Sequence, residues 1–413
     1  MRDTDAILVR PAHVPLHYRL AAKLVLAGLA RWSAGALMMR LPDGRAVQFG
    51  GPAAERRVSI VVKDWKFFWR LLTAGDVGVG ESYTEGEWTC TDLVELFRQF
   101  FHDQSVLASG WSWTVLTRLR HWALRLLRAN TPAGSRRNIQ YHYDLSNDLY
   151  RLFLDESMTY SCALFEREDM TLREAQERKL DDICGRLDLG PGLALLEIGS
   201  GWGGFAIHAA RHYGCHVTSL TLSEQQRQLA RERVRAAGVE ALVDVRLCDY
   251  RHVTGSFDRI VSIEMFEAVG YAYYDAFFTQ CGRLLKPGGR MLLQTITVPD
   301  QRFDTYRREF DWIRKYIFPG GLLASLHAIV DTLKRRTDFR IEWARDIGLH
   351  YARTLRCWRE QFLSRLPEVR RLGFDDRFIR MWEFYLASCE AAFSVREIGD
   401  LQIVMARPHA SSA

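Results

Sequence analysis

The chain has 413 residues, of which 48% are hydrophobic and 26% charged, and it carries a net charge of +6 at pH 7. These values indicate an ordinary globular protein of about two domains, with a mild basic excess that permits contact with anionic surfaces without requiring it. The eight cysteines form no C-x-x-C pair, so no zinc site or thioredoxin-like motif is indicated, and dispersed thiols suit a reducing cytoplasm. The first residues lack the shape of a secretory signal, and the apolar stretch 20–30 is far shorter than the ~20 residues that span a bilayer, so membrane contact is expected to be peripheral.

Residues 1–107 are predicted to form a small α+β domain that packs against the rest of the chain or contacts lipid. Pro42-Asp43-Gly44 is a good hairpin turn between two strand-like runs, and Asp92 can cap a following helix. A glycine-rich, acidic stretch at 75–87 separates the two expected helices. The predicted strands are 36–40, 45–49 and 58–62, and the predicted helices are 67–73 and a second that ends at Phe101. No catalytic constellation is present in this domain.

Residues 108–137 are predicted to be a basic, aromatic, helical connector. Three tryptophans (111, 113 and 122) alternate with arginines, and no acid lies between Ser109 and Arg137. A helix of this composition can lie on an anionic membrane surface, although its tryptophans can equally pack between domains. Thr131-Pro132-Ala133-Gly134-Ser135 has the composition of a linker.

From residue 138 the pattern changes to alternating strands and helices. This alternation predicts an α/β fold, with a Rossmann-like sheet covered by helices on both faces. Lys286-Pro287-Gly288-Gly289 is expected to interrupt the chain before the fifth strand. The strands are expected at 193–198, 216–220, 243–247, 259–263, 290–296, 341–343 and 401–406, with helices at 223–237 and 274–285 among those between them.

The glycine-rich turn after the first of these strands marks a nucleotide site. Gly199, Gly201 and Gly204 fit the dinucleotide pattern G-x-G-x-x-G, while Glu197 with Gly199, Gly201 and Gly203 fits E-x-G-x-G-x-G of S-adenosylmethionine methyltransferases. The second strand ends without the acid that a dinucleotide enzyme usually places there. Asp249-Tyr250 after the third strand supplies an acid and an aromatic ring, which favours a single adenosyl group.

These residues belong to a longer series of motifs that resembles the cyclopropane-fatty-acid synthases and the related mycolic acid methyltransferases. The resemblance runs from about residue 138 to the C-terminus, and the N-terminal domain is similar to that of the branch that acts on phospholipids. The motifs are Tyr141-His142-Tyr143-Asp144, Tyr160-Ser161-Cys162-Ala163, Glu197 to Gly204, Thr221-Leu222-Ser223, Met265-Phe266-Glu267 and Tyr316-Ile317-Phe318-Pro319-Gly320.

The resemblance implies that the sulfonium methyl of S-adenosylmethionine passes to a cis double bond of an unsaturated phospholipid acyl chain. A carbocation forms, and loss of a proton from the new methyl closes a cyclopropane ring. In this family a bound bicarbonate is the base, and the matching positions are Cys162, Glu267, Gln294, Ile296 and Tyr351. Glu267 and Tyr351 are expected to hydrogen-bond this anion with their side chains, and Cys162 and Ile296 chiefly with their backbone. Since a glutamate repels an adjacent anion, we expect the site to share a proton.

One departure from the family concerns Gln294, which stands where the family typically has histidine. An amide can donate to bicarbonate but cannot take up a proton, so a proton relay through this residue is excluded. The alternative is that the cation loses a neighbouring proton and the product is a methyl-branched or otherwise methylated acyl chain without a ring.

For S-adenosylmethionine the resemblance implies contacts along the strand ends. The amino-acid end would meet Tyr160, Ser161 and the glycines, the ribose would meet Thr221, Leu222 and Gln226, the adenine would lie near Asp249, Tyr250 and Arg251, and His142 and Tyr143 would lie at the mouth. Cys389 matches a cysteine once assigned to the active site of this family. It shares a helix face with Tyr385 and Phe393, which favours core packing.

The segment 300–330 is predicted to be a lid over an acyl chain. Its first part is rich in large apolar side chains, and Arg307, Arg308, Arg314 and Lys315 could meet phosphate headgroups. The predicted location is cytoplasmic, at the inner face of the membrane, with no nucleic acid partner and no metal; a homo-oligomer is left open. Two competing functions are a nucleotide-dependent oxidoreductase and a lipid-binding protein with a disabled enzyme fold.

Overall fold

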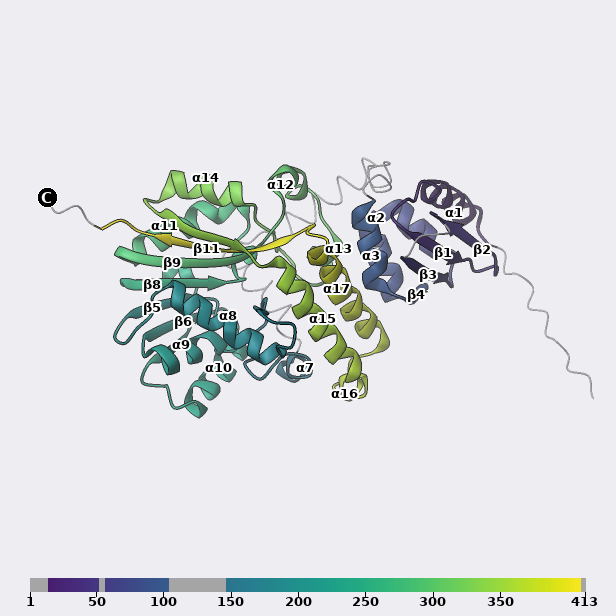
Figure 1. Cartoon of the computed structure of the whole chain (residues 1–413). Coiled ribbons are helices and arrows are strands. Elements are labelled where there is room, and N and C mark those ends of the chain that lie inside the picture. Colours follow the sequence, from purple (N-terminus) through teal and green to yellow (C-terminus); the bar gives the residue numbers. More distant parts are fainter. Residues whose placement is uncertain (1–13, 52–55, 104–145, 410–413) are drawn as a thin grey trace, which may run out of the picture. The chain divides into compact units, whose positions relative to one another are not determined.

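The computed structural model describes residues 14–51, 56–103 and 146–409, and Figure 1 shows them as ribbons. The chain divides into two compact units, of which the first comprises residues 1–118 with 376–384 and the second residues 119–375 with 385–413. The predicted connector 108–137 lies outside the described residues, and so do His142 and Tyr143.

The first unit is an α+β structure built on a small sheet. Within the described residues its strand order is β2-β1-β3-β4, with β1 antiparallel to β2 and parallel to β3. The Asp92 carboxylate caps the helix that follows the sheet by accepting a hydrogen bond from the backbone N–H of Glu95 at 2.9 Å. The elements are α1 (Leu16–Leu29), β1 (Ala36–Arg40), β2 (Ala46–Phe49), β3 (Arg57–Val62), α2 (Lys66–Thr84), β4 (Trp88–Cys90) and α3 (Leu93–His102).

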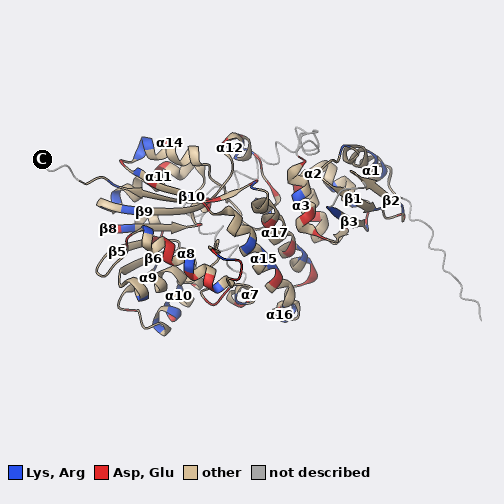
Figure 2. Cartoon of the chain, viewed as in Figure 1, with Lys and Arg blue, Asp and Glu red and all other residues tan. Residues whose placement is uncertain are grey.

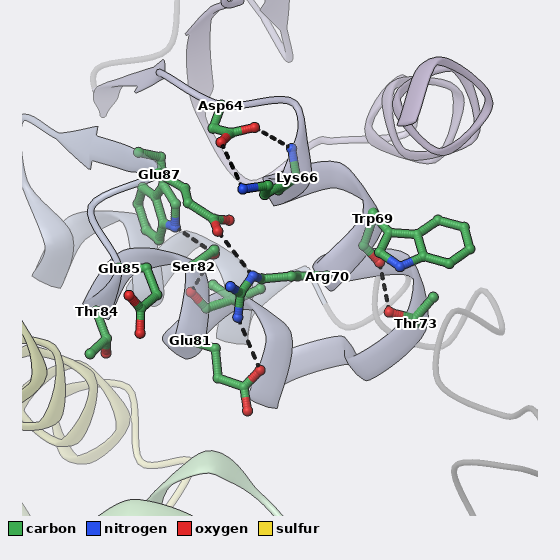
Figure 3. Close-up of polar contacts among 12 residues, drawn as sticks. Asp64, Lys66, Trp69, Arg70, Thr73, Glu81, Ser82, Thr84, Glu85 and Glu87 are labelled. Carbon is green, nitrogen blue, oxygen red and sulfur yellow. Dashed lines mark hydrogen bonds and ion pairs between the residues drawn. The ribbon is translucent and has the colours of Figure 1, made fainter. Parts of the chain in front are cut away.

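The glycine-rich stretch of this unit is helical, whereas the sequence predicted that the helix would end at residue 73. Helix α2 continues to Thr84 across a kink at Gly75, whose φ is 56°. The kink turns the two halves together so closely that a Cβ at Gly78 would lie 2.0 Å from the carbonyl oxygen of Arg70. In Figure 3 the Arg70 guanidinium lies between the carboxylates of Glu81 and Glu87, at 3.4 and 3.0 Å. The glycines therefore allow a helical corner that these ion pairs hold.

The second unit contains a sheet with the strand order β10-β11-β9-β8-β5-β6-β7 among the described residues. Strand β11 runs antiparallel to both of its neighbours, and the other pairs are parallel. The predicted break at Lys286–Gly289 is instead a bulge inside β9, where the pairing with β8 shifts register between Phe257 and Arg259. The strands are β5 (Ala194–Ile198), β6 (His216–Thr221), β7 (Val243–Leu247), β8 (Phe257–Ile263), β9 (Leu285–Thr297), β10 (Arg340–Asp346) and β11 (Gly399–Ala406).

Helices cover both faces of this sheet, and each face has its own apolar core. One core contains Phe277, Phe278 and Ile329, and the other contains Ile183 and Ala209. In Figure 2 the charged residues lie mainly on the helices and loops, while the strands are largely tan. The helices after residue 146 are α7 (Asn147–Arg151), α8 (Leu172–Arg186), α9 (Gly204–Tyr213), α10 (Glu224–Ala236), α11 (Tyr274–Leu284), α12 (Asp300–Tyr306), α13 (Trp312–Tyr316), α14 (Leu326–Arg336), α15 (Gly348–Ser364), α16 (Leu366–Arg371) and α17 (Asp376–Ser394), with single 3-10 turns at Tyr250–His252, Phe266–Ala268 and Tyr271–Tyr273. Residues 376–384 of α17 belong to the first unit.

This architecture confirms the predicted α/β class with a Rossmann-like sheet. It also fixes where a ligand can bind, because β5 is flanked by β6 on one side and β8 on the other. The connections leave β5 in opposite directions, and in such sheets the ligand lies beyond the carboxyl ends of the strands at this switch point.

Candidate active site

The glycine loop joins the end of β5 to the start of α9. Gly199 has a φ of 103°, and a Cβ at this position would lie 2.9 Å from the Cβ of Met265. Gly203 has a φ of 83° and precedes the first residue of α9. Both positions require glycine because an L side chain is strained at positive φ. The loop therefore presents backbone, without side chains, to the space in front of the helix N-terminus, which favours a group with negative charge.

A cavity of about 170 Å³ opens beyond the carboxyl ends of β5, β6 and β8. Its wall contains most of the residues that the resemblance implied for S-adenosylmethionine, namely Tyr160, Ser161, Gly199, Gly201, Thr221, Leu222, Gln226, Asp249, Tyr250 and Arg251. Gly203 lies next to the lining residue Gly204 in the same loop. His142 and Tyr143 lie outside the described residues, so their predicted place at the mouth stays a prediction.

The polar groups at the far side of this cavity are held in place by one another. The Thr221 hydroxyl donates to Oε1 of Gln226 at 2.9 Å. The Asp249 carboxylate accepts from the backbone N–H of Arg251 at 3.0 Å and from its guanidinium at 2.9 and 2.6 Å. The ring of Tyr250 packs edge-on against Phe277. Polar groups with an aromatic ring beside them suit the ribose and base of an adenosyl ligand.

A buried lysine in the cavity wall was not expected from the sequence. Lys179 on α8 is fully buried, and its ammonium group donates to the Ser161 hydroxyl at 2.8 Å. Burial lowers its pKa, while the nearby carboxylates of Glu264 and Asp400 act in the opposite direction. A buried ammonium group requires negative partners, so Lys179 balances charge in the carboxylate cluster beside it. Its position in a polar helix gave no sequence signal of this role.

The carboxylate at the centre of the cluster is Glu264, which the sequence analysis did not single out. It follows β8 directly and lines the cavity. Its Oε1 accepts from the backbone N–H of Cys162 at 2.7 Å and from Nε2 of Gln294 at 2.8 Å, and its Oε2 accepts from the Tyr351 hydroxyl at 2.6 Å. These are three of the groups that the sequence analysis assigned to bicarbonate. A second acid three residues before Glu267, at the carboxyl end of a strand, was the signal that could have found it.

Glu267 is held differently. Its Oε1 accepts from the backbone N–H of Ile296 at 2.5 Å and from the Thr295 hydroxyl at 3.0 Å, and its Oε2 is buried with no hydrogen-bond partner among the described residues. Burial, with a smaller effect from Glu264, raises the pKa of Glu267 to about 7. Tyr351 and Glu267 were expected to bind the same anion. In the structure the Tyr351 hydroxyl bonds Glu264 directly.

Gln294 connects Glu264 to a second acid, Asp400, which is buried. Its Nε2 donates to Glu264 at 2.8 Å and to Oδ2 of Asp400 at 2.9 Å, while its Oε1 accepts from Nε2 of Gln402 at 3.0 Å. Burial, followed by the charge of Glu264, raises the pKa of Asp400 far above its ordinary value. Two carboxyl groups that contact the same amide nitrogen disfavour being ionised together, so the pair is expected to hold one proton. The sequence analysis expected proton sharing at this site, but with bicarbonate as one of the partners.

Two other predicted residues make no side-chain contribution of this kind. Ile296 contributes its backbone N–H to Glu267, as described above. Cys389 lies on α17, and burial raises the pKa of its thiol to about 12, so it stays protonated at neutral pH.

Comparison with known proteins places this geometry in a family. The family model described as mycolic acid cyclopropane synthetase matches residues 131–403. The chain belongs to this cyclopropane synthase family. A tuberculostearic acid methyltransferase of Mycobacterium tuberculosis is 42% identical over 92% of this chain and 91% of its own length. The cyclopropane-fatty-acyl-phospholipid synthase of Escherichia coli is 38% identical over 88% of this chain and 90% of its own length.

A solved structure of the same family supports the cofactor site. A mycolic acid cyclopropane synthase in complex with S-adenosylhomocysteine and CTAB is 36% identical, with a TM-score of 0.62, and matches 66% of this chain and 98% of its own. This cyclopropane synthase family member is therefore an S-adenosylmethionine-dependent methyltransferase. That assignment sets aside the oxidoreductase alternative. The cavity wall fits the cofactor. The glycine loop leaves room for a charged end of the ligand, and the polar and aromatic residues suit its ribose and base.

Proposed function

We propose that this enzyme transfers a methyl group to a cis double bond of an unsaturated acyl chain in a phospholipid and closes a cyclopropane ring. The observation that carries the proposal is a half-buried carboxylate, Glu264, in the wall of the cofactor cavity. An alkene offers neither a lone pair nor an acidic proton, so its methylation leaves a carbocation on the chain. A carboxylate shielded from water is suited to stabilise this charge and to take up a proton.

The residues of the site supply positioning and charge. S-adenosylmethionine supplies, when bound, a methyl group on a positively charged sulfur. The glycine loop and the Thr221–Gln226 pair would hold the adenosyl part, and Glu264 in the same cavity wall would be available to the reacting carbon atoms. An alkene is a weak nucleophile, so fixing it against the methyl group accounts for much of the rate. Exclusion of water prevents hydration of the cation.

The product without a ring is a second candidate. Two relatives support different products by name, since one is a tuberculostearic acid methyltransferase and the other a cyclopropane synthase. Gln294 cannot carry a proton away, which favours loss of a proton from a neighbouring carbon and a methylated, unsaturated chain. Glu264 favours ring closure, because it places a direct proton acceptor at the site.

The segment after β9 supports an acyl-chain wall. The segment that joins β9 to α14 contains five buried large apolar residues, namely Phe303, Tyr306, Phe310, Trp312 and Ile317. We propose that this apolar segment borders the hydrocarbon tail. Arg314, which was expected to meet phosphate, is instead buried and bound to the Asp311 carboxylate at 3.0 Å and to the carbonyl oxygen of Tyr306 at 3.0 Å.

A lipid substrate requires contact with a membrane surface, and α1 offers a face for it. Leu16, Leu20 and Leu24 lie four residues apart and are 68, 53 and 56% exposed. Arg19 and Lys23 are exposed beside them, and α1 contains no acid. An apolar stripe flanked by cations suits the surface of an anionic bilayer. Within the described residues, no helix is long and apolar enough to cross a membrane.

Labelled product analysis tests the function. The purified enzyme is incubated with methyl-labelled S-adenosylmethionine and vesicles of phosphatidylglycerol with monounsaturated chains, and the extracted fatty acids are analysed by mass spectrometry. A saturated ring at the former double bond supports cyclopropane formation, and a methyl or methylene branch with a retained double bond supports the second candidate. Absence of label in any acyl chain would contradict both.

Vesicle binding tests the membrane surface. Replacing all three α1 leucines by serine is expected to weaken sedimentation with anionic vesicles at least tenfold, with unchanged activity on a detergent-solubilised substrate. Leu372→Ser is the matched control, because Leu372 is 40% exposed on the second unit. Equal vesicle binding by the triple variant and the control would remove α1 from the proposal.

A further inference from the structure

The donors around Glu264 form a complete binding site for a carboxylate-shaped anion. The backbone N–H of Cys162 and the amide of Gln294 meet Oε1, and the Tyr351 hydroxyl meets Oε2. Each distance lies between 2.6 and 2.8 Å. A bicarbonate ion presents the same planar pair of oxygens that the side chain of Glu264 presents here. Since the donors are already used, no set of them remains for a second anion.

Charge leads to the same result. Asp400 and Lys179 are buried, Glu264 and Glu267 are half-buried beside them, and Lys179 is the one buried ammonium group that the structure shows in this cluster. Adding bicarbonate would place a further negative charge in this cluster without a matching cation. Burying an unpaired charge is strongly unfavourable, so the site as built does not fit bicarbonate.

We propose that the Glu264 side chain replaces bicarbonate and is the proton acceptor of the reaction, with Asp400 as a positioning residue that acts through Gln294. This inference rests on the proposed methyl transfer to an acyl double bond. A C–H bond of the methylated chain breaks, and its proton passes to a carboxylate oxygen of Glu264. The electron pair of that bond closes the ring, or forms a new double bond in the second candidate product. Glu264 becomes a carboxylic acid and releases its proton to water as the products leave.

The backbone conformation of Glu264 supports a functional role for this residue. Its φ is 49°, in the left-handed region where a residue other than glycine is uncommon. Such conformations persist where the surrounding structure holds them and are concentrated at functional sites. The Gln294 amide has a fixed orientation, because Gln402 donates to its oxygen and both of its hydrogens face carboxylates. Asp400 therefore holds the amide that holds Glu264.

The experiment compares wild type with Glu264→Gly in buffer freed of carbon dioxide. Glycine suits the φ at this position, so the variant is expected to fold, and it opens the donor set to a free anion. Wild type is expected to react at the same rate, within a factor of two, with and without added bicarbonate. Glu264→Gly is expected to lose at least 100-fold in rate without an anion and to recover at least tenfold with bicarbonate or formate. Asp188→Gly is the matched control, because Asp188 also has a φ of 49° and lies on an exposed turn.

Anion binding gives a readout that does not depend on catalysis. In thermal-shift titrations, formate is expected to raise the melting temperature of Glu264→Gly and to leave wild type and Asp188→Gly unchanged. Glu264→Gln keeps the shape of the side chain but cannot take up the proton at the same oxygen pair, and it is expected to be inactive with or without bicarbonate. The proposal is overturned if wild type requires bicarbonate, if either Glu264 variant keeps wild-type activity without an anion, or if formate affects wild type and Glu264→Gly alike. If neither wild type nor any variant methylates an acyl chain, the proposed function fails. The formate titration then still decides whether Glu264 fills an anion site.

Discussion

Replacing Glu197 by glutamine is expected to remove a pH-dependent loss of stability. Glu197 is the fourth residue of β5 and is buried next to the cofactor cavity, where its carboxylate accepts a hydrogen bond from the Ser219 hydroxyl on the neighbouring strand. Burial raises its pKa from 4.5 to about 7, although Ser219 and Lys179 oppose the shift. Glutamine has the same shape and can accept the same bond, but it never ionises.

The size of the effect follows from the difference in proton affinity. Between pH 4.5 and about 7 the unfolded chain has lost this proton while the folded chain keeps it, so the free energy of unfolding falls as the pH rises. Roughly 2.5 pH units at ~1.4 kcal/mol each give about 3.5 kcal/mol for a fully buried group. Below pH 4.5 both states are protonated, and above pH 7 both are ionised, so the contribution is constant at either end.

Thermal unfolding of wild type and Glu197→Gln is measured at intervals between pH 4.5 and 8.5. The two proteins are expected to melt together near pH 5, and the variant is expected to melt roughly 7–14 °C higher at pH 8, if each kcal/mol shifts the midpoint by ~2–4 °C. Glu240→Gln, at an exposed position after α10, is the control and should follow wild type throughout. Parallel curves for wild type and Glu197→Gln across this range would refute the claim that Glu197 keeps its proton in the folded chain up to about pH 7.

Three further substitutions test the site. Gly203→Ala places a side chain at a φ of 83° and is expected to cost about 1 kcal/mol of stability and to weaken S-adenosylmethionine binding several-fold by isothermal titration calorimetry. Lys179→Met removes the buried cation that favours ionised Glu264, so the acid limb of the pH–rate profile should move to higher pH; a superimposable profile would contradict this role. Arg233 donates to the backbone carbonyls of residues 156, 157 and 202 at 2.6–3.1 Å, so Arg233→Met should leave these acceptors unpaired and lower the stability by about 2–3 kcal/mol in urea unfolding, and a loss below about 0.5 kcal/mol would contradict it.

The large sheet could be predicted from the sequence because its strands are short apolar runs with turn signals at both ends. Val243–Leu247 has the predicted bounds, and Ser223 caps α10 as its sequence indicates. The errors arise where local composition competes with packing. Gly75–Glu87 has the composition of a loop, yet close contact between the two halves of α2 and the ion pairs of Arg70 keep it helical as far as Thr84.

The cofactor wall could be predicted for a different reason. Its residues follow directly after strand ends, so the topology of the sheet brings them together whatever the details of side-chain packing. Thr221 is the last residue of β6, Asp249 lies two residues after the end of the neighbouring strand β7, and both line one cavity. The carboxylate cluster has no such rule, because it joins side chains from β8, β9, β11, α8 and α15 through long-range contacts.

The exchange at Gln294 and the acid at Glu264 explain each other once they are seen together. A histidine at position 294 could carry a proton and act beside a free anion, whereas the amide present here has two N–H groups that match two carboxylates. Considered alone, Gln294 removes a proton relay and makes ring closure doubtful. Considered with Glu264, it holds in place a base that belongs to the chain itself, so the loss of the relay residue does not remove the proton acceptor. Single-residue comparison with a family therefore misjudges this site, because its chemistry depends on a pair of positions 30 residues apart in the sequence that share one hydrogen bond.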